Sequence, residues 1–172
     1  MHFLSFALCL GDGLRWIAVG GAIVLACGPS SVRASEADVQ AAIDKANLYV
    51  ETAKNTERAV DSWERYASWV NMKTGLYDVE PLLKEARDAA VLEPRAEAVD
   101  AAMVRYISAY EALAPVMQEA AAYYERQGYE ADKMALGKAL HPKMVPLATA
   151  FMAERKVMMP LLRAHLREVE AL

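Results

Sequence analysis

The feature that most constrains the fold is a long apolar stripe with helical spacing. Its members follow one another at steps of four and three residues: Val99, Met103, Tyr106, Tyr110, Leu113, Met117, Ala120 and Tyr124. This spacing keeps the side chains on one face of an α-helix and is typical of a coiled-coil seam. Strand patterns, in which apolar and polar residues alternate, are nearly absent from the chain. The sequence therefore predicts an all-α protein.

A first helix is predicted from Ser35 to about Met72, and Gly75 ends it. Ser35 is expected to cap this helix, because a serine hydroxyl can accept a hydrogen bond from the free N–H groups of the first turn. Glu36 and Asp38 then stand where the helix dipole favours negative charge. The apolar stripe of this helix is Val39, Ile43, Ala46, Val50, Ala53, Val60, Trp63, Ala67 and Val70.

The next two helices are expected to be a short one followed by a long one. A second helix is expected to be capped by Asp78, to have Pro81 in its first turn and to run to Leu92, where Glu93-Pro94 ends it. The third helix carries the seam, and Gly128 is its expected C-cap. Its interior Pro115 should kink it, because proline cannot donate a backbone hydrogen bond.

The last part of the chain is predicted in two pieces. Asp132 is expected to cap a short helix that ends at Leu140. His141-Pro142 should interrupt the helical structure, because a residue before proline avoids the helical region. A final helix then covers about 143–171, with Pro160 bending it. Its inward residues are Met144, Leu147, Phe151, Met158, Leu161, His165 and Val169. The predicted architecture is an elongated antiparallel bundle of about four helices, two or three of them long and one or two proline-kinked.

Residues 1–34 have the order of features that is typical of an export signal. Arg15 precedes an uncharged apolar run over 16–27, Gly28-Pro29 breaks it, and small residues lead to Ala34. The run has 12 residues, whereas a membrane-spanning helix needs about 20. We therefore expect a signal peptide over 1–34, a single helical domain over 35–172, and an exported protein in the periplasm or at the cell envelope. Asp12 is unusual in a signal, and a start codon further downstream would explain it.

Two processing sites fit this segment. One is a cut between Ala34 and Ser35. The other lies before Cys27, because Val24-Leu25-Ala26-Cys27 is similar to the lipobox of bacterial lipoproteins. In that case the Cys27 thiol takes a diacylglycerol and anchors the protein to a membrane. In the simpler interpretation, Cys27 is one more apolar residue of the signal.

Composition and motifs exclude several classes of protein. The formal net charge is −4 with both signs interleaved, and the concentrated basic patch of a nucleic-acid-binding protein is missing. Cys9 and Cys27 both lie in the signal, so residues 35–172 contain no thiol for a disulfide or a metal. Zinc-binding, di-iron, phosphate-loop and nucleophile-elbow motifs are not found. We therefore expect no catalytic residues, no metal, no cofactor and no enzymatic activity.

One stretch, Tyr123–His141, is dense in groups that can bind a ligand. Its candidate ligand-binding residues are Tyr124, Tyr129, Asp132, Lys138 and His141. Tyrosine offers a flat apolar face with one hydroxyl, and an exposed histidine titrates near neutrality. In the structural alternative, Tyr124 belongs to the core stripe and the charged side chains face solvent.

A set of short motifs extends over residues 40–170. These are Leu48-Tyr49-Val50, Tyr66-x-x-Trp69-Val70, Leu113-Ala114-Pro115, Tyr123-Tyr124, Tyr129-x-x-Asp132-Lys133, Gly137-Lys138-Ala139-Leu140-His141-Pro142 and Phe151. Together they resemble the YiiG-like family of predicted bacterial lipoproteins. The resemblance implies an exported, mostly helical and often lipid-anchored domain of unknown function, and it assigns no catalytic residues. Similar members continue past the position of Leu172, so this chain is expected to be a shortened form, with a partner chain supplying the missing cover.

Three functions follow as hypotheses. The first is a non-enzymatic helical module that contacts an unknown envelope protein or another copy of itself. The alternative is a bundle that binds a small ligand or metal through the Tyr123–His141 segment. The third is a structural oligomer in which the Val99–Tyr124 seam pairs between chains.

Overall fold

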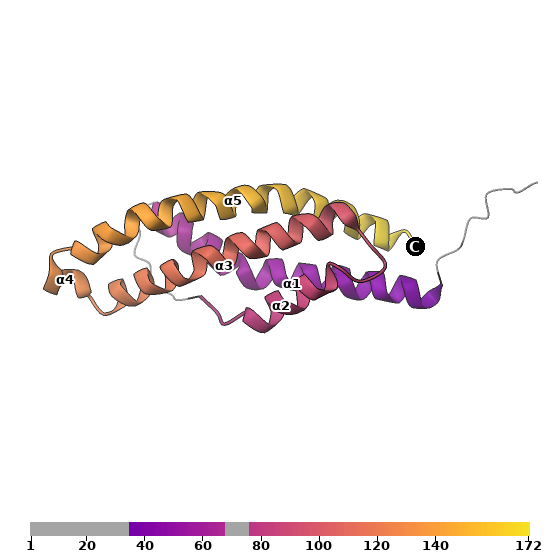
Figure 1. The fold of residues 1–172 in the computed structure, drawn as a ribbon, viewed down its shortest axis with the longest axis horizontal. Helices are drawn as coiled ribbons and strands as arrows, with labels where there is room; N and C mark the ends of the chain where they lie inside the picture. The colour runs from indigo at the N-terminus through magenta and orange to yellow at the C-terminus, as the bar shows by residue number, and fades with distance from the viewer. Residues whose placement is uncertain (1–34, 68–75) are drawn as a thin grey trace, which may run out of the picture. The chain divides into compact units, whose positions relative to one another are not determined.

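The computed structural model describes residues 35–67 and 76–172, and within these ranges it contains five α-helices and no strand (Figure 1). The all-α prediction is confirmed. The helices are α1 (Glu36–Ala67), α2 (Glu80–Ala89), α3 (Glu97–Glu125), α4 (Gly128–Asp132) and α5 (Ala135–Glu170). The predicted export signal, including Cys27 and Ala34, lies outside the described residues, as does the end of the first predicted helix.

Cross-helix contacts show that the long helices have the expected directions. Tyr49 and Thr56 of α1 bond Asp100 and Tyr106 of α3, in the same order along both helices, so α1 and α3 are parallel. Glu57 and Tyr66 of α1 bond Arg155 and His141 of α5 in reverse order, so α5 is antiparallel to both. Figure 1 shows α5 lying along α3, with α1 beside them.

The predicted cap of α1 is confirmed. The Ser35 hydroxyl accepts a hydrogen bond from the Asp38 N–H at 3.1 Å, and the Asp38 carboxylate accepts from the Ser35 N–H at 3.1 Å. This reciprocal pair is a capping box in which aspartate takes the usual place of glutamate. The hydrogen bonds from Ser35 lower the pKa of Asp38.

The buried face of α1 is more polar than its apolar stripe predicts. Four polar side chains lie along its centre, at steps of four, three and four residues: Lys45, Tyr49, Thr52 and Thr56. Much of the predicted apolar stripe lies on either side of this row. Ile43 and Val50 of the stripe are only half-buried, and Ala67 is exposed. The threonine hydroxyls donate to carbonyls one turn earlier in α1, which satisfies them inside the bundle.

Two predicted boundaries in the first half of the bundle are wrong. Val79 rather than Asp78 is the N-cap of α2, although the Asp78 carboxylate does accept a weak bond of 3.3 Å from the Glu80 N–H. The helix also ends at Ala89, before the predicted Leu92. The backbone carbonyls of Leu92 and Pro94 instead accept hydrogen bonds from the Lys45 ammonium, which holds this connection away from a helical conformation.

The prediction that Gly128 is the C-cap of the third helix is also wrong. The helix ends at Glu125, and Gln127 takes the left-handed conformation with φ of 54°. Gly128 begins α4 instead. An added Cβ on Gly128 would lie 2.7 Å from a Tyr123 ring carbon, so the glycine is required for close packing rather than for its φ angle.

The predicted break at His141-Pro142 does not occur, because α5 runs without interruption from Ala135 to Glu170. Three prolines lie inside α5 and one inside α3: Pro142, Pro146, Pro160 and Pro115. All four are on the exposed side of their helices. The carbonyls that lose a hydrogen bond therefore face water, which can replace the missing donor, and α5 curves in Figure 1 rather than breaking.

The core lies mainly between α3 and α5. The seam residues from Val99 to Ala120 are all buried, whereas Tyr124 is half-buried and Tyr123 takes its place in the core. Phe151 of α5 contacts two seam rings, with centroids 5.2 Å from Tyr106 and 5.9 Å from Tyr110. Because the seam is covered from within the chain, it is not available to pair with a second chain.

Candidate functional site

Aromatic side chains gather where α1 and α3 end and α5 begins. This region, called here the aromatic end, contains two groups of contacting rings: Trp63, Tyr66 and His141, and Tyr123, Tyr124 and Tyr129. Neighbouring ring centroids lie between 5.1 and 6.3 Å apart. Such distances are in the range of favourable aromatic contacts. Five of the six rings are half-buried or exposed, so the cluster is open to solvent on one side.

Tyr66 and His141 form the outer part of the aromatic end. The Tyr66 hydroxyl and His141 Nδ1 share a hydrogen bond of 2.6 Å. The Trp63 ring stacks on Tyr66 with centroids 5.8 Å apart. Burial raises the pKa of Tyr66, and the neighbouring Tyr124 raises it further. The phenol therefore stays protonated near neutral pH and can donate or accept within this pair.

Tyr123 and Asp132 form the inner part. The Tyr123 hydroxyl donates to Asp132 Oδ1 at 2.6 Å, and Asp132 Oδ2 accepts from the Leu136 N–H at 2.9 Å. These bonds lower the pKa of Asp132, the one from Tyr123 most strongly. Desolvation and the bond to Asp132 raise the pKa of Tyr123 to about 12. Asp132, the last residue of α4, thus bonds the first turn of α5. The N-cap of α5 is nevertheless Met134, so the prediction that Asp132 caps the helix is wrong.

The chain around α4 is tightly constrained. Three residues without the freedom of glycine, Gln127, Lys133 and Met134, have positive φ angles of 54°, 53° and 68°. Such conformations are uncommon and persist where the surroundings hold them. An added Cβ on Gly137 would also come within 3.0 Å of the Tyr124 hydroxyl. The aromatic end is therefore closely packed on its inner side.

The structure brings most of the sequence-predicted candidates together. Tyr124, Tyr129, Asp132 and His141 all contribute to the aromatic end or bond a member of it. Lys138 instead projects from the exposed side of α5. Within 35–67 and 76–172, no three His, Cys, Asp or Glu side chains lie together in a way that could hold a metal ion.

Sequence reasoning missed Trp63 and Tyr66 as members of this cluster. Both are far from the other members along the chain, and their place depends on the antiparallel packing of α1 against α5. The signal that could have found them is the Tyr66-x-x-Trp69 motif, which accompanies the Tyr123–His141 motifs in the family resemblance.

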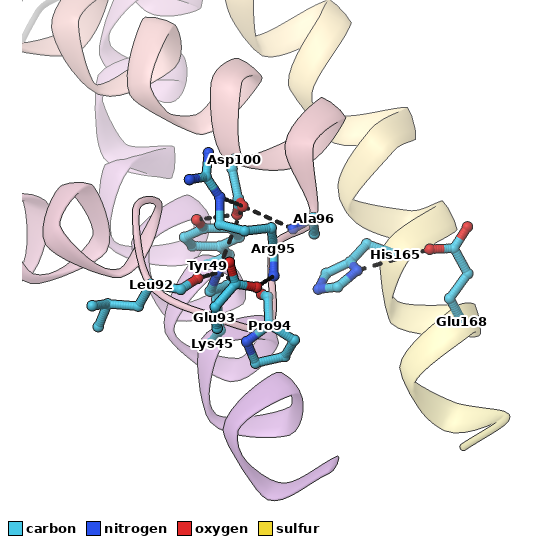
Figure 2. A network of polar contacts seen from close by, with 10 residues as sticks. All are labelled: Lys45, Tyr49, Leu92, Glu93, Pro94, Arg95, Ala96, Asp100, His165 and Glu168. Carbon is cyan, nitrogen blue, oxygen red and sulfur yellow. Dashed lines mark hydrogen bonds and ion pairs between the residues drawn. The ribbon is translucent and has the colours of Figure 1, made fainter. Parts of the chain in front are cut away.

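A second polar network, shown in Figure 2, lies at the other end of α1. Lys45 and Asp100 are only 5% and 2% exposed, and the Lys45 Nζ lies 3.5 Å from Asp100 Oδ2. The same ammonium donates to the carbonyls of Leu92 and Pro94 at 2.6 and 2.8 Å. The Tyr49 hydroxyl donates to Asp100 Oδ1 at 2.7 Å. This network ties the α2–α3 connection to α1.

Every buried polar group of this network has a role in the fold. Asp100 Oδ2 accepts a bond of 2.8 Å from the Ala96 N–H, the residue before α3 begins. Burial, and then the bond to Asp100, raises the pKa of Tyr49 far above its ordinary value. Tyr49 is therefore a permanent donor to a carboxylate. The network has the properties of a structural brace rather than of a reactive centre.

His165 lies beside this network in Figure 2 but has a different environment. Its Nδ1 is 3.9 Å from the exposed Glu168 carboxylate, while its Nε2 is buried and finds no partner among the described residues. The ring is half-buried at the edge of the core, near where its helical spacing places it.

The described residues thus define an all-α bundle with a buried polar brace near the start of α1 and an aromatic cluster at its other end. Residues 40–159 match the model of the family described as "Protein of unknown function (DUF3829)", and the chain belongs to this family. The sequence is also 30% identical over 132 residues to "Uncharacterized protein YiiG" of Escherichia coli (strain K12), across 66% of this chain and 38% of that protein.

The family resemblance predicted from the motifs is confirmed by both matches. The chain spans about two fifths of the length of the curated relative that it matches. No solved structure matches the chain. None of the helices in 35–67 and 76–172 combines the length and apolar character that crossing a membrane requires.

Proposed function

We propose that this protein is a non-enzymatic helical module of the cell envelope that is exported through residues 1–34 and contacts another envelope component through its aromatic end. The observation that carries the proposal is the half-open cluster around Tyr66 and His141, mounted on the ends of three long helices. Aromatic rings with polar tips are enriched at protein interfaces, because they combine large apolar area with hydrogen-bonding groups.

Hydrogen bonds on the inner side of the aromatic end hold its rings in place, and this order favours binding. The bond from Tyr123 to Asp132 and the bond from the Leu136 N–H to Asp132 hold the inner rings in place. A surface that is already ordered loses less conformational entropy when a partner binds. Asp132 has both carboxylate oxygens engaged, so it is less available to a small ligand than the sequence pattern suggests. A macromolecular contact therefore fits this surface better than a small-ligand site.

Site-specific photo-crosslinking tests the contact. A photoreactive residue placed at Tyr129 in living cells should give discrete adducts with one envelope component. The same residue at Glu51, exposed on the side of α1, is the matched control and should give none. Equal adducts at both positions, or none at Tyr129, would contradict a contact through the aromatic end.

Export is tested separately with alkaline phosphatase fused after residue 172. This enzyme needs disulfides that form in the periplasm and not in the reducing cytosol. The fusion should be active, and Ala22→Arg in the apolar run should abolish its activity. An active fusion carrying Ala22→Arg would contradict the signal.

Labelling with a radioactive fatty acid tests the lipid anchor. Label that persists in Cys27→Ser would exclude Cys27 as the site of the anchor.

A further inference from the structure

A groove with an apolar floor lies between α1 and α2, away from the aromatic end. Leu48 of α1, Ala89 at the end of α2 and Leu92 of the following connection line it. Leu92 and the adjacent Val91 are 59% and 68% exposed, although both side chains are apolar. Two large apolar side chains exposed beside a groove are a feature of binding surfaces.

The rim of this groove is acidic. Its carboxylates are Asp44, Glu85, Asp88 and Glu93. Of the two lysines that line the groove, Lys84 bonds Asp88 on the surface at 2.5 Å. The other, Lys45, directs its ammonium to two backbone carbonyls and to Asp100 inside the bundle. The rim therefore carries excess negative charge, and it complements an occupant with a basic edge.

Helix α5 carries the opposite charge on its outer side. At 100° per residue, Lys138, Lys156, Arg163 and Arg167 lie within about 40° of one another on a single row. All four are exposed. The exposed Glu170 lies about 20° from Arg163 at the end of the row, which therefore keeps a net positive charge. Glu154, the acidic residue nearest to Lys156 in sequence, is engaged by Arg105 at 3.1 Å.

The groove and this basic row cannot meet within one molecule. α2 packs against α1 and α3, and α5 packs against α1, α3 and α4, so α2 and α5 lie on opposite sides of the bundle (Figure 1). The segment from Lys156 to Arg167 spans about 16 Å of helix, and the α1 wall from Ala41 to Leu48 spans about 10 Å. A helix segment of this size is long enough to fill the groove.

We propose that the α1–α2 groove binds the basic outer row of α5 from a second copy of this chain. The contact joins two different surfaces, so it leaves a groove free on one copy and a basic row free on the other. Such a head-to-tail contact generates open chains of molecules unless its rotation closes a ring. This proposal is independent of the aromatic end, because the segment that docks, Lys156–Arg167, begins 15 residues after His141.

Analytical ultracentrifugation of residues 35–172 tests the association. The wild type should form species larger than a dimer as its concentration rises, and added salt should weaken them, because salt screens exposed charges. A wild type that remains monomeric over the whole concentration range would overturn the proposal.

Charge reversal identifies the two surfaces. Asp44→Lys with Glu85→Lys alters the groove, and Lys156→Glu with Arg163→Glu alters the basic row. Each double variant alone should be monomeric, because its groove and its row then carry the same charge. An equimolar mixture should associate again, because the groove of each variant is opposite in charge to the row of the other. Circular dichroism confirms that both variants are folded. Assembly of either variant at wild-type strength, or no recovery in the mixture, would overturn the proposal.

Matched controls separate the groove from a general effect of charge. Glu119→Lys with Glu125→Lys makes the same charge change on exposed positions of α3 as the groove variant makes. Lys54→Glu with Arg126→Glu does the same for the basic row. Both controls should associate like the wild type. If they too are monomeric, net charge rather than the groove governs association, and the proposal fails.

Discussion

Lys45 and Asp100 are buried within 3.5 Å of each other, yet the two hydrogen bonds of the Lys45 ammonium go to backbone carbonyls. Asp100 in turn accepts its bonds from the Tyr49 hydroxyl and the Ala96 N–H. Charge attraction therefore brings the two side chains together, while their hydrogen bonds organise the backbone on either side. The pair closes the α2–α3 connection onto α1.

Asp100→Ala should strongly destabilise the bundle. It leaves the Lys45 charge buried without its counter-charge and leaves the Tyr49 hydroxyl without an acceptor. Removing one member of a buried ion pair lowers the free energy of unfolding by about 3–5 kcal/mol. Urea unfolding followed by circular dichroism measures the change. Lys84→Met removes an exposed pair with Asp88 and should change stability by less than about 1 kcal/mol. Equal effects of the two variants would contradict a bracing role.

Gly128→Ala should loosen the inner side of the aromatic end. The new methyl group would lie 2.7 Å from a Tyr123 ring carbon and 3.3 Å from the Tyr123 carbonyl oxygen. Overpacking of this kind lowers stability by about 1–3 kcal/mol. Combining it with Tyr123→Phe should give no relief, since the ring remains, whereas Tyr123→Ala should make the glycine substitution harmless. Thermal unfolding of Gly128→Ala alone and of the two double variants, each compared with its Tyr123 single variant, measures this. A neutral Gly128→Ala would show that the ring moves freely.

Pro146→Ala should stabilise α5. Pro146 is exposed and lies inside the helix, where proline removes one backbone hydrogen bond. A proline in a helix interior is about 3 kcal/mol less favourable than alanine, and the stiffer unfolded chain offsets part of this. We expect the free energy of unfolding to rise by about 1–2 kcal/mol in a urea titration. A loss of stability would mean that the core requires the curvature of α5.

The bundle should lose stability in alkali because of its buried tyrosines. Burial raises the pKa of Tyr106 to about 12, whereas a tyrosine in an unfolded chain titrates near pH 10. The stabilising contribution is thus fully present below pH 10 and is lost as the pH rises toward 12. Urea unfolding at a series of pH values measures the loss. In Tyr106→Phe the loss over this range should be smaller, and an unchanged alkaline profile would contradict the assignment.

Sequence pattern was sufficient for the long helices and for most of the core. The Val99–Ala120 seam and the Ser35 cap follow from local rules, because helical spacing and capping depend on residues only a few positions apart. The break at His141-Pro142 was predicted from an equally local rule and was wrong. That rule does not consider the exposure of the proline. On the solvent side of α5 water can replace the lost hydrogen bond, so its loss destabilises the helix little.

The candidate site was predictable only in part. Tyr124, Tyr129, Asp132 and His141 are close in sequence, so a dense stretch revealed them. Trp63 and Tyr66 join them only through the packing of α1 on α5. The Lys45–Asp100 brace was missed for a similar reason. A lysine on a helix is ordinarily a solvated residue, and its burial depends on carbonyls supplied by a connection far along the chain.

The polar row of α1 has a consequence for how the long helices can be aligned. Apolar faces alone would permit α1 to slide along its neighbours by one helical turn with little loss. Such a slide would carry Tyr49 away from Asp100 and Thr56 away from Tyr106, and it would leave the Tyr49 and Tyr106 hydroxyls without partners in hydrocarbon. Unsatisfied groups of this kind are unfavourable by about 1–3 kcal/mol each. The hydroxyls therefore select a single axial alignment of the helices, which the apolar side chains do not specify by themselves.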